Sequence, residues 1–320
     1  MKLSRVGEFG LIEILKAGEK RLRLDTVVGI GDDCAVIKPG TSNLELHHIS
    51  NAPKSKSQNY LLLTTDTFIE NVHFKLKKDQ FYDVGFKAMA ANISDIAAMG
   101  GWPTHALVTI GLPSKTTVKQ VKQLYRGINQ LAAKHKIDII GGDTISSPRE
   151  VVVSITLLGE VEKENLLLRS GANKGDVICV TGRFGGPAAK KFKVLSSKLK
   201  DRVYEARRIA KSKIATSMID SSDGLVRSVI EICRSSKVGA RIFEEEVPIA
   251  KGASLAQALY GGEEYELVFT VPRKQIAKIG KLGFKVTIVG EIVAHGSGIK
   301  LIDKHDKIKP LRSGGYEHFK

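Results

Sequence analysis

Aspartates recur in this chain beside glycines and at the predicted ends of strands. Asp32 and Asp33 stand together in "GIGDDCAVI", between two apolar runs. Asp66 follows two threonines after a leucine-rich run, and Asp143 follows two glycines in "GGDT". A single aspartate in a turn is ordinary turn chemistry. As a set at strand ends, however, these side chains can be aimed into one shared cleft.

Three further carboxylates extend this set. Asp220 and Asp223 bracket "DSSD" after an apolar run, and Asp95 lies inside an alanine-rich helical pattern. A carboxylate on such a helix needs a partner. Lys87 lies on the same helical face, so a simple Lys87–Asp95 pair is one alternative. If the carboxylates converge instead, cations must offset their repulsion, and Mg²⁺ takes carboxylates together with substrate phosphates.

Glycine placement favours a phosphate-bearing ligand. "GGDT" allows a close backbone approach, and Asp143 beside it can hold a metal on a bound phosphate. "VTGRFGGPAA" is predicted to be a second glycine turn that opens a helix, whose N-terminus favours anions. The sequence contains neither GxxxxGK[ST] nor GxGxxG, and no HRD or DFG set. A Walker site, a Rossmann site and a protein kinase therefore have no motif support.

Strand-like and helix-like patterns alternate along the chain. Helices are predicted over residues 7–15, 83–99 and 118–135, with Asp83 capping the second. Strands are predicted at "YLLLTTD", at "KIDIIGGDT", which runs into a glycine turn, and at "VVVSITLLGEV". The alternation predicts an α/β or α+β architecture. We place a domain boundary near Lys163, which divides the chain into residues 1–163 and 164–320.

Composition indicates an ordinary globular chain. Its 320 residues suit two domains, and 42% apolar content permits a substantial core. No apolar stretch approaches the roughly 20 residues of a membrane span. The N-terminus has no apolar signal-peptide region. The three cysteines are far apart, which argues against disulfides or structural zinc and predicts a cytoplasmic location.

The chain carries a formal net charge of +16. Such an excess can attract nucleic acid or phosphate ligands. Its densest segment, Lys190–Lys213, is interpreted as a solvated helical face. Aromatic residues make up only 6% of the chain, and the sequence has no RNP1 or zinc pattern. A nucleic-acid-binding protein is therefore the weaker alternative, and nucleic acid is not expected as a partner.

An ordered set of motifs resembles one known family. "GEFGLI", "GIGDDCAVI", "TTDTFIENVHF", "FKAMAANISDIAAMG", "GGDT", "RSGANKGD", "IDSSDGL", "GGEEYELVFT" and "GGYEHF" occur in this order between residues 7 and 319. The set resembles the thiamine-monophosphate kinase family of the aminoimidazole-ribonucleotide-synthetase-like superfamily. Each motif alone is weak, whereas the ordered series is specific.

The resemblance implies a fold, a reaction and a set of residues. The fold would be an N-terminal α/β domain with a mixed sheet that joins its partner's in a homodimer, and a C-terminal α+β domain. The reaction would be direct transfer of the ATP γ-phosphoryl group to thiamine monophosphate with several Mg²⁺ ions. Metal ligands would be Asp33, Thr64, Thr65, Asp66, Asp95, Asp143, Asp220 and Asp223. ATP contacts would be Gly142, Asp143, Arg169 and Ser222, and substrate contacts would be His73, Glu263 and Tyr316.

Several positions depart from the family's usual pattern or admit a plainer interpretation. Glu264 stands where the family usually has aspartate, so its role is left open, and Thr64 keeps the hydroxyl of a commoner serine. The segment Thr41–Tyr60 is longer than expected. Taken alone, His73 and Arg169 would be read as surface side chains. The rival assignments are other ATP-dependent enzymes of the same superfamily, such as selenophosphate synthetase or the hydrogenase-maturation relative.

Overall fold

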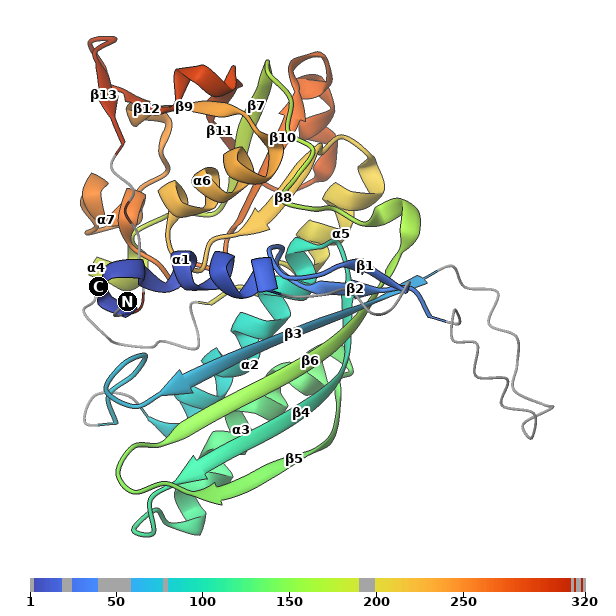
Figure 1. The fold of residues 1–320 in the computed structure, drawn as a ribbon, viewed down its shortest axis with the longest axis vertical. Helices are drawn as coiled ribbons and strands as arrows, with labels where there is room; N and C mark the ends of the chain where they lie inside the picture. Colours follow the sequence, from blue (N-terminus) through green and yellow to red (C-terminus); the bar gives the residue numbers. More distant parts are fainter. Residues whose placement is uncertain are drawn as a thin grey trace, which may run out of the picture.

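The structure is a computed structural model that describes residues 3–18, 25–39, 59–76, 80–189, 199–311, 314 and 318. Tyr316, most of Thr41–Tyr60 and the first part of Lys190–Lys213 lie outside these residues. Two β-sheets, each with its own helices, make up the molecule (Figure 1). Among the described residues, no helix has the length and apolarity needed to cross a bilayer.

The first sheet is built from the N-terminal half of the chain. Its strands are β1 (Thr26–Val28), β2 (Ala35–Ile37), β3 (Asn59–Ile69), β4 (Trp102–Leu112), β5 (Asp138–Ser146) and β6 (Val152–Glu162). They lie in the order β1-β2-β3-β6-β4-β5. β4 and β5 pair in parallel, and the other pairs are antiparallel. The sheet is therefore mixed, as predicted.

Two long helices, α2 (Phe81–Ala98) and α3 (Val118–His135), cover one face of this sheet (Figure 1). α3 begins at a capping box between Thr117 and Gln120. The two helices cross closely, since a Cβ on Gly85 would lie 2.0 Å from the Leu124 carbonyl oxygen. α2 is buried almost throughout because it also contacts α5 (Val203–Ser212) and β8 (Ser217–Asp220) of the C-terminal half.

The second sheet has seven strands in the order β13-β12-β9-β11-β7-β10-β8. Besides β8, they are β7 (Asp176–Thr181), β9 (Gly239–Phe243), β10 (Leu267–Pro272), β11 (Val286–Val293), β12 (Ile299–Ile302) and β13 (Ile308–Pro310). Besides α5, the α-helices of this half are α4 (Gly186–Ala189), α6 (Leu225–Ser236) and α7 (Leu255–Tyr260). Short 3₁₀ helices are η1 (Lys163–Asn165), η3 (Glu244–Glu246), η4 (Arg273–Leu282) and η5 (His295–Ser297).

One hydrophobic core runs through both halves of the molecule. It joins Ile96 of α2 and Met99, the C-cap of that helix, to Val203 of α5 and Phe269 of β10. A second cluster under α6 belongs to the second sheet alone. The first helix, α1 (Leu3–Gly18), lies against α6, where the Arg234 guanidinium is 2.6 Å from the Glu13 carboxylate. The two halves therefore share buried surface, and α2 is the element between them.

Three local predictions were wrong. α2 begins at Phe81 with Gln80 as its N-cap, so Asp83 lies in the first turn and does not cap the helix. β5 continues through Gly141 and Gly142 to Ser146 instead of ending in a turn. The reason is that its parallel pairing with β4 extends over this whole stretch, which overrides the turn preference of the glycines. Asp66 and Asp143 accordingly lie within strands, not at their ends.

Candidate active site

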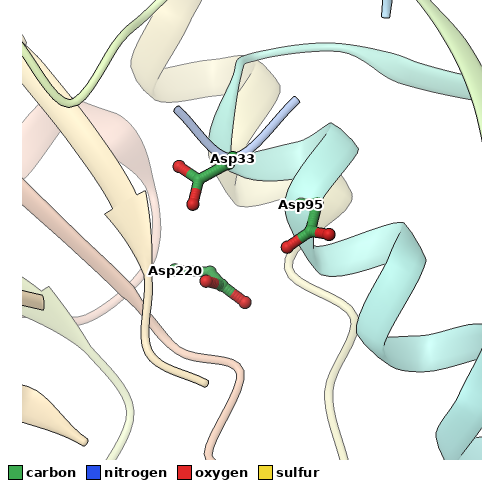
Figure 2. Close-up of side chains that lie close together, drawn as sticks. All are labelled: Asp33, Asp95 and Asp220. Carbon is green, nitrogen blue, oxygen red and sulfur yellow. The ribbon is translucent and has the colours of Figure 1, made fainter. Parts of the chain in front are cut away.

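Three of the predicted aspartates converge although they come from distant parts of the sequence. Asp33 lies between β1 and β2, Asp95 lies in the last turns of α2, and Asp220 ends β8. Figure 2 shows their carboxylates turned toward a common space. One oxygen from each lies within 4.8 Å of the others. This spacing suits oxygen ligands around a single divalent cation.

Each carboxylate of this cluster is held by a neighbouring donor. Arg169 donates to Asp33 Oδ1 from Nη2 at 2.6 Å and from Nε at 3.2 Å. Thr64 Oγ1 donates to Asp95 at 2.5 Å, and Ser94 Oγ donates to Asp220 at 2.6 Å. Among the described residues, Asp33 Oδ2 is buried without a hydrogen-bond partner. That orphaned oxygen in an acidic cluster fits a site made for a cation.

Burial and mutual repulsion favour the protonated forms of these acids. Burial is the main reason that the pKa of Asp33 is raised, although the Arg169 guanidinium opposes it. The pKa of Asp95 is raised well above its usual value by burial and by the charges of Asp66 and Asp220. Burial and then Asp33 raise the pKa of Asp220 to about 8. A bound divalent cation would reverse this preference and keep the carboxylates ionised.

Asp66 and Asp223 lie at the edge of the cluster. Both line the same cleft as Asp95. Burial raises the pKa of Asp66 to about 6, and burial followed by the charge of Glu8 raises that of Asp223 to about 7. They can therefore add ligands or charge to an ion held by the cluster.

The neighbouring Asp32 has a different role from Asp33. Its carboxylate accepts from the backbone N–H of Asp33 at 3.0 Å and from that of Arg169 at 3.2 Å. Burial, and then repulsion by Asp33, raise the pKa of Asp32 to about 7. The two adjacent aspartates coexist because backbone donors fix one of them and a guanidinium neutralises the other.

Three predicted site residues of the first sheet lie apart from the cluster. Thr65 faces the other side of β3 from Thr64, and its hydroxyl donates to the Ile155 carbonyl at 3.2 Å. Asp143 lies exposed on the edge strand β5 and accepts from the Thr144 N–H at 2.8 Å. Gly142 has φ +148°, and a Cβ there would lie 1.8 Å from the Val108 carbonyl oxygen. Only glycine fits this close approach.

A cleft of about 1680 Å³ is lined by Asp95 of the cluster and by residues from both halves of the molecule. Among the predicted residues, His73, Ser222 and Glu263 line it together with Asp66, Asp95 and Asp223. His73 Nδ1 accepts from the Ile69 N–H at 3.0 Å, so the ring proton is on Nε2. The cleft is large enough for a nucleotide and a second small molecule.

Two cleft residues, Lys87 and Glu264, were left without a role by sequence reasoning. Lys87 pairs with Glu263, whereas Asp95 accepts from Thr64, so the predicted alternative of a Lys87–Asp95 pair is not formed. Glu264 is 6% exposed and accepts from the Gly185 N–H at 2.8 Å, which fixes the glycine turn before α4. Burial raises its pKa to about 8. For Lys87, the sequence feature that could have indicated a role was a charged residue inside an alanine-rich helix.

Comparison with known proteins agrees with this geometry. Residues 31–161 match the family model of the AIR synthase related protein N-terminal domain, and residues 173–302 match that of the C-terminal domain. The thiamine-monophosphate kinase of Bacillus subtilis is 34% identical over 92% of this chain and 94% of its own length. The Escherichia coli enzyme of that name is 32% identical over 98% of both chains. The chain belongs to the thiamine-monophosphate kinase family.

A solved structure of AaThiL complexed with AMPPCP and TMP shows the same fold. It superposes with a TM-score of 0.80 at 28% identity, and the match covers 99% of both chains. The two-domain architecture expected of the thiamine-monophosphate kinase family, with an α/β and an α+β part, is thereby confirmed, and the chain is a member of a family of ATP-dependent phosphotransferases.

The aspartates make the stability of this kinase-family member depend on pH when no metal is present. Folded-state pKa values of about 6 to 8 lie above the ordinary 3.8, so between pH 4 and 8 the folded state keeps protons that the unfolded state releases. Stability therefore falls as pH rises through this window. We expect the free energy of unfolding in chelator to fall by at least about 2 kcal/mol from pH 5 to pH 8.

Urea denaturation at both pH values, with and without Mg²⁺, measures this effect. Added Mg²⁺ should restore more stability at pH 8 than at pH 5, because it binds the ionised carboxylates. A metal-free protein that is equally or more stable at pH 8 would contradict the assignment of these raised pKa values.

Proposed function

We propose that this chain transfers the γ-phosphoryl group of ATP directly to thiamine monophosphate, giving thiamine diphosphate and ADP. The observation that carries the proposal is the convergence of Asp33, Asp95 and Asp220, since Asp95 also lines the cleft that His73 and Glu263 line. The curated relatives bear the name of this activity, and the AaThiL complex contains AMPPCP and TMP.

The reaction asks for charge neutralisation more than for a general base. The nucleophile is a phosphate oxygen of the acceptor, already largely ionised at neutral pH because its second pKa is about 6. Two polyanions must approach in line, so repulsion between them is the main obstacle. The cluster consists of three carboxylates, which can hold the cations that neutralise the phosphates. Such a transfer needs this composition.

We assign Mg²⁺ to the cluster of Asp33, Asp95 and Asp220, with Asp66, Asp223 and Thr64 beside it. When bound, Mg²⁺ supplies positive charge to the phosphoryl oxygens of both substrates. Arg169 fixes the Asp33 carboxylate through a hydrogen-bonded ion pair at 2.6 Å and partly offsets the effect of its burial. Thr64 and Ser94 hold the other two carboxylates in fixed orientations, which keeps the ligand geometry in place before substrates arrive.

The remaining residues of the motif keep their proposed roles. ATP contacts are assigned to Gly142, Asp143, Arg169 and Ser222, and substrate contacts to His73, Glu263 and Tyr316. Thr65 and Asp143 stay in the metal-site motif, Thr65 through its position next to Asp66.

We propose a homodimer in which the first sheets of two copies join. β5 supports it, because this edge strand is exposed and presents Ile140 at 59% and Ile145 at 53% exposure. A second copy over this edge would cover those side chains and also Gly142 and Asp143. We keep the division at residues 163 and 164, and the cytoplasm as the location, where the buried thiols of the three cysteines stay reduced.

The test is an endpoint assay with purified protein, ATP and thiamine monophosphate. We expect thiamine diphosphate and ADP in equal amounts with Mg²⁺, and neither product when a chelator replaces it. Separation of the products by chromatography identifies both. A folded, Mg²⁺-loaded sample that forms neither product would overturn the substrate assignment, and the related ATP-dependent synthetase reactions would then be tested on the same sample.

A further inference from the structure

A buried lysine lies in the cleft, outside the set of residues used above. Lys87 belongs to α2, is 2% exposed and is one of the residues that line the cleft. Nζ forms an ion pair with Glu263 and donates to the His73 carbonyl oxygen at 3.2 Å. It also lies 5.3 Å from the centre of the Phe68 ring. Lys87 therefore touches both substrate residues assigned above that the structure describes.

A buried ammonium group is costly unless its donors are satisfied. Here the cation's partners are a carboxylate and a carbonyl on the wall of the cleft, and the helix positions one, three and four residues later are alanines. If this position only had to be filled, an apolar side chain of similar volume would be sufficient. The lysine instead fixes the direction in which the Glu263 carboxylate faces.

The groups around Lys87 form a matched pair of donor and acceptor. His73 carries its ring proton on Nε2, because Nδ1 accepts from Ile69. Burial, followed by the charges of His318 and Lys87, lowers the pKa of His73 to about 4, so the ring is a neutral donor near pH 7. Glu263 offers an acceptor carboxylate. An aminopyrimidine ring, with an amino donor and ring-nitrogen acceptors, complements such a pair.

We propose that Lys87 is a positioning residue for the aminopyrimidine end of the acceptor, which it recognises through Glu263 and His73. This role rests on the proposed function. Lys87 and Asp95 lie on one face of α2, eight residues or about 12 Å apart at the rise of an α-helix. Lys87 therefore acts at the far end of the acceptor from the reacting phosphate, and its loss affects acceptor binding more than the chemical step.

The experiment compares the steady-state kinetics of Lys87→Met with those of the unaltered enzyme. We expect the KM for thiamine monophosphate to rise at least about ten-fold, with kcat within about three-fold and the KM for ATP unchanged. If the unaltered enzyme is active and folded Lys87→Met has the same acceptor KM, this role alone would be overturned. An inactive unaltered enzyme would overturn the proposed function itself, and with it this role.

Arg207→Met is a matched control. Arg207 is 4% exposed and, like Lys87, binds one carboxylate and one carbonyl: Glu162 at 2.6 Å and Gly100 at 2.7 Å. It does not line the cleft. Its variant should lose stability without any selective change in the acceptor KM. An equal rise in acceptor KM in both variants would mean that Lys87 acts only through the fold.

Two further measurements separate a positioning role from a structural one. In Lys87→Met the pKa of His73, followed by NMR titration, should rise toward its usual value, whereas Arg207→Met leaves it unmoved. The double variant Lys87→Met/Glu263→Gln removes both charges of the ion pair, which keeps it testable where the unpaired Glu263 carboxylate prevents Lys87→Met from folding. Its acceptor KM should equal that of Glu263→Gln alone, and a further ten-fold rise would overturn action through Glu263.

Discussion

Asp95→Asn is expected to lower kcat by at least about a thousand-fold, since the variant loses one anionic ligand of the proposed metal site. Asp95 lies beside Asp33 and Asp220 and is repelled by Asp66 as well. Removal of its charge relieves this repulsion, so the variant should be as stable as the parent, or more stable, in chelator. Product formation and urea denaturation measure the two effects.

Asp176→Asn provides the matched control for that substitution. Asp176 is a buried carboxylate of β7 that accepts from the Asn173 N–H at 2.9 Å and from the Thr216 hydroxyl at 2.7 Å. It lies in the second sheet, away from the cluster. Its loss should weaken the fold and leave kcat near the parent value. Near-normal turnover by Asp95→Asn would remove Asp95 from the metal site.

Arg169→Met is expected to lower the free energy of unfolding by about 3–5 kcal/mol in chelator at pH 8, because it leaves the Asp33 carboxylate buried and unpaired. The carboxyl side chain of Asp33 is 1% exposed and depends on this guanidinium. At pH 5 the loss should be smaller, since Asp33 then takes up a proton. Mg²⁺ should also reduce the loss by supplying the missing positive charge. Urea denaturation under these three conditions measures the differences.

Arg241→Met serves for comparison because its ion pair with Glu291 lies on the surface, at 3.3 Å, with the arginine side chain 44% exposed. Such pairs contribute about 1 kcal/mol or less. If Arg169→Met cost no more than Arg241→Met, with no dependence on pH or Mg²⁺, the neutralising role of Arg169 would be wrong.

The sequence predicted the two-part α/β and α+β fold, and the comparisons confirmed it. Helix 118–135 was predicted with its observed bounds because its amphipathic pattern runs over the whole helix. The start of α2 was missed, since a helix buried on nearly every side has no polar face to mark where it begins. The glycines of β5 were misread because strand pairing, which the sequence does not display, outweighs local preference.

The candidate site was predictable as a list of residues but not as an arrangement. The motifs named Asp33, Asp95 and Asp220, yet only the packing of α2 against β8 brings the second and third together. The partner of Lys87 is 176 positions away in the sequence, so a local pattern pointed to Asp95 instead of Glu263. Long-range contacts of this kind have no signature in a single sequence.

Because Lys87 and Asp95 lie on one helix, α2 sets a fixed spacing against which the length of the acceptor is selected. An α-helix keeps its rise per residue, so the two positions stay about 12 Å apart along the helix axis whatever the second sheet does. Under the proposed assignments, a molecule that fits one end and is too short reaches only half of its partners. A product that is longer by one phosphate has to lose its contacts at one of the two ends. The same fixed spacing would thus select acceptors by their length and weaken the binding of the longer product.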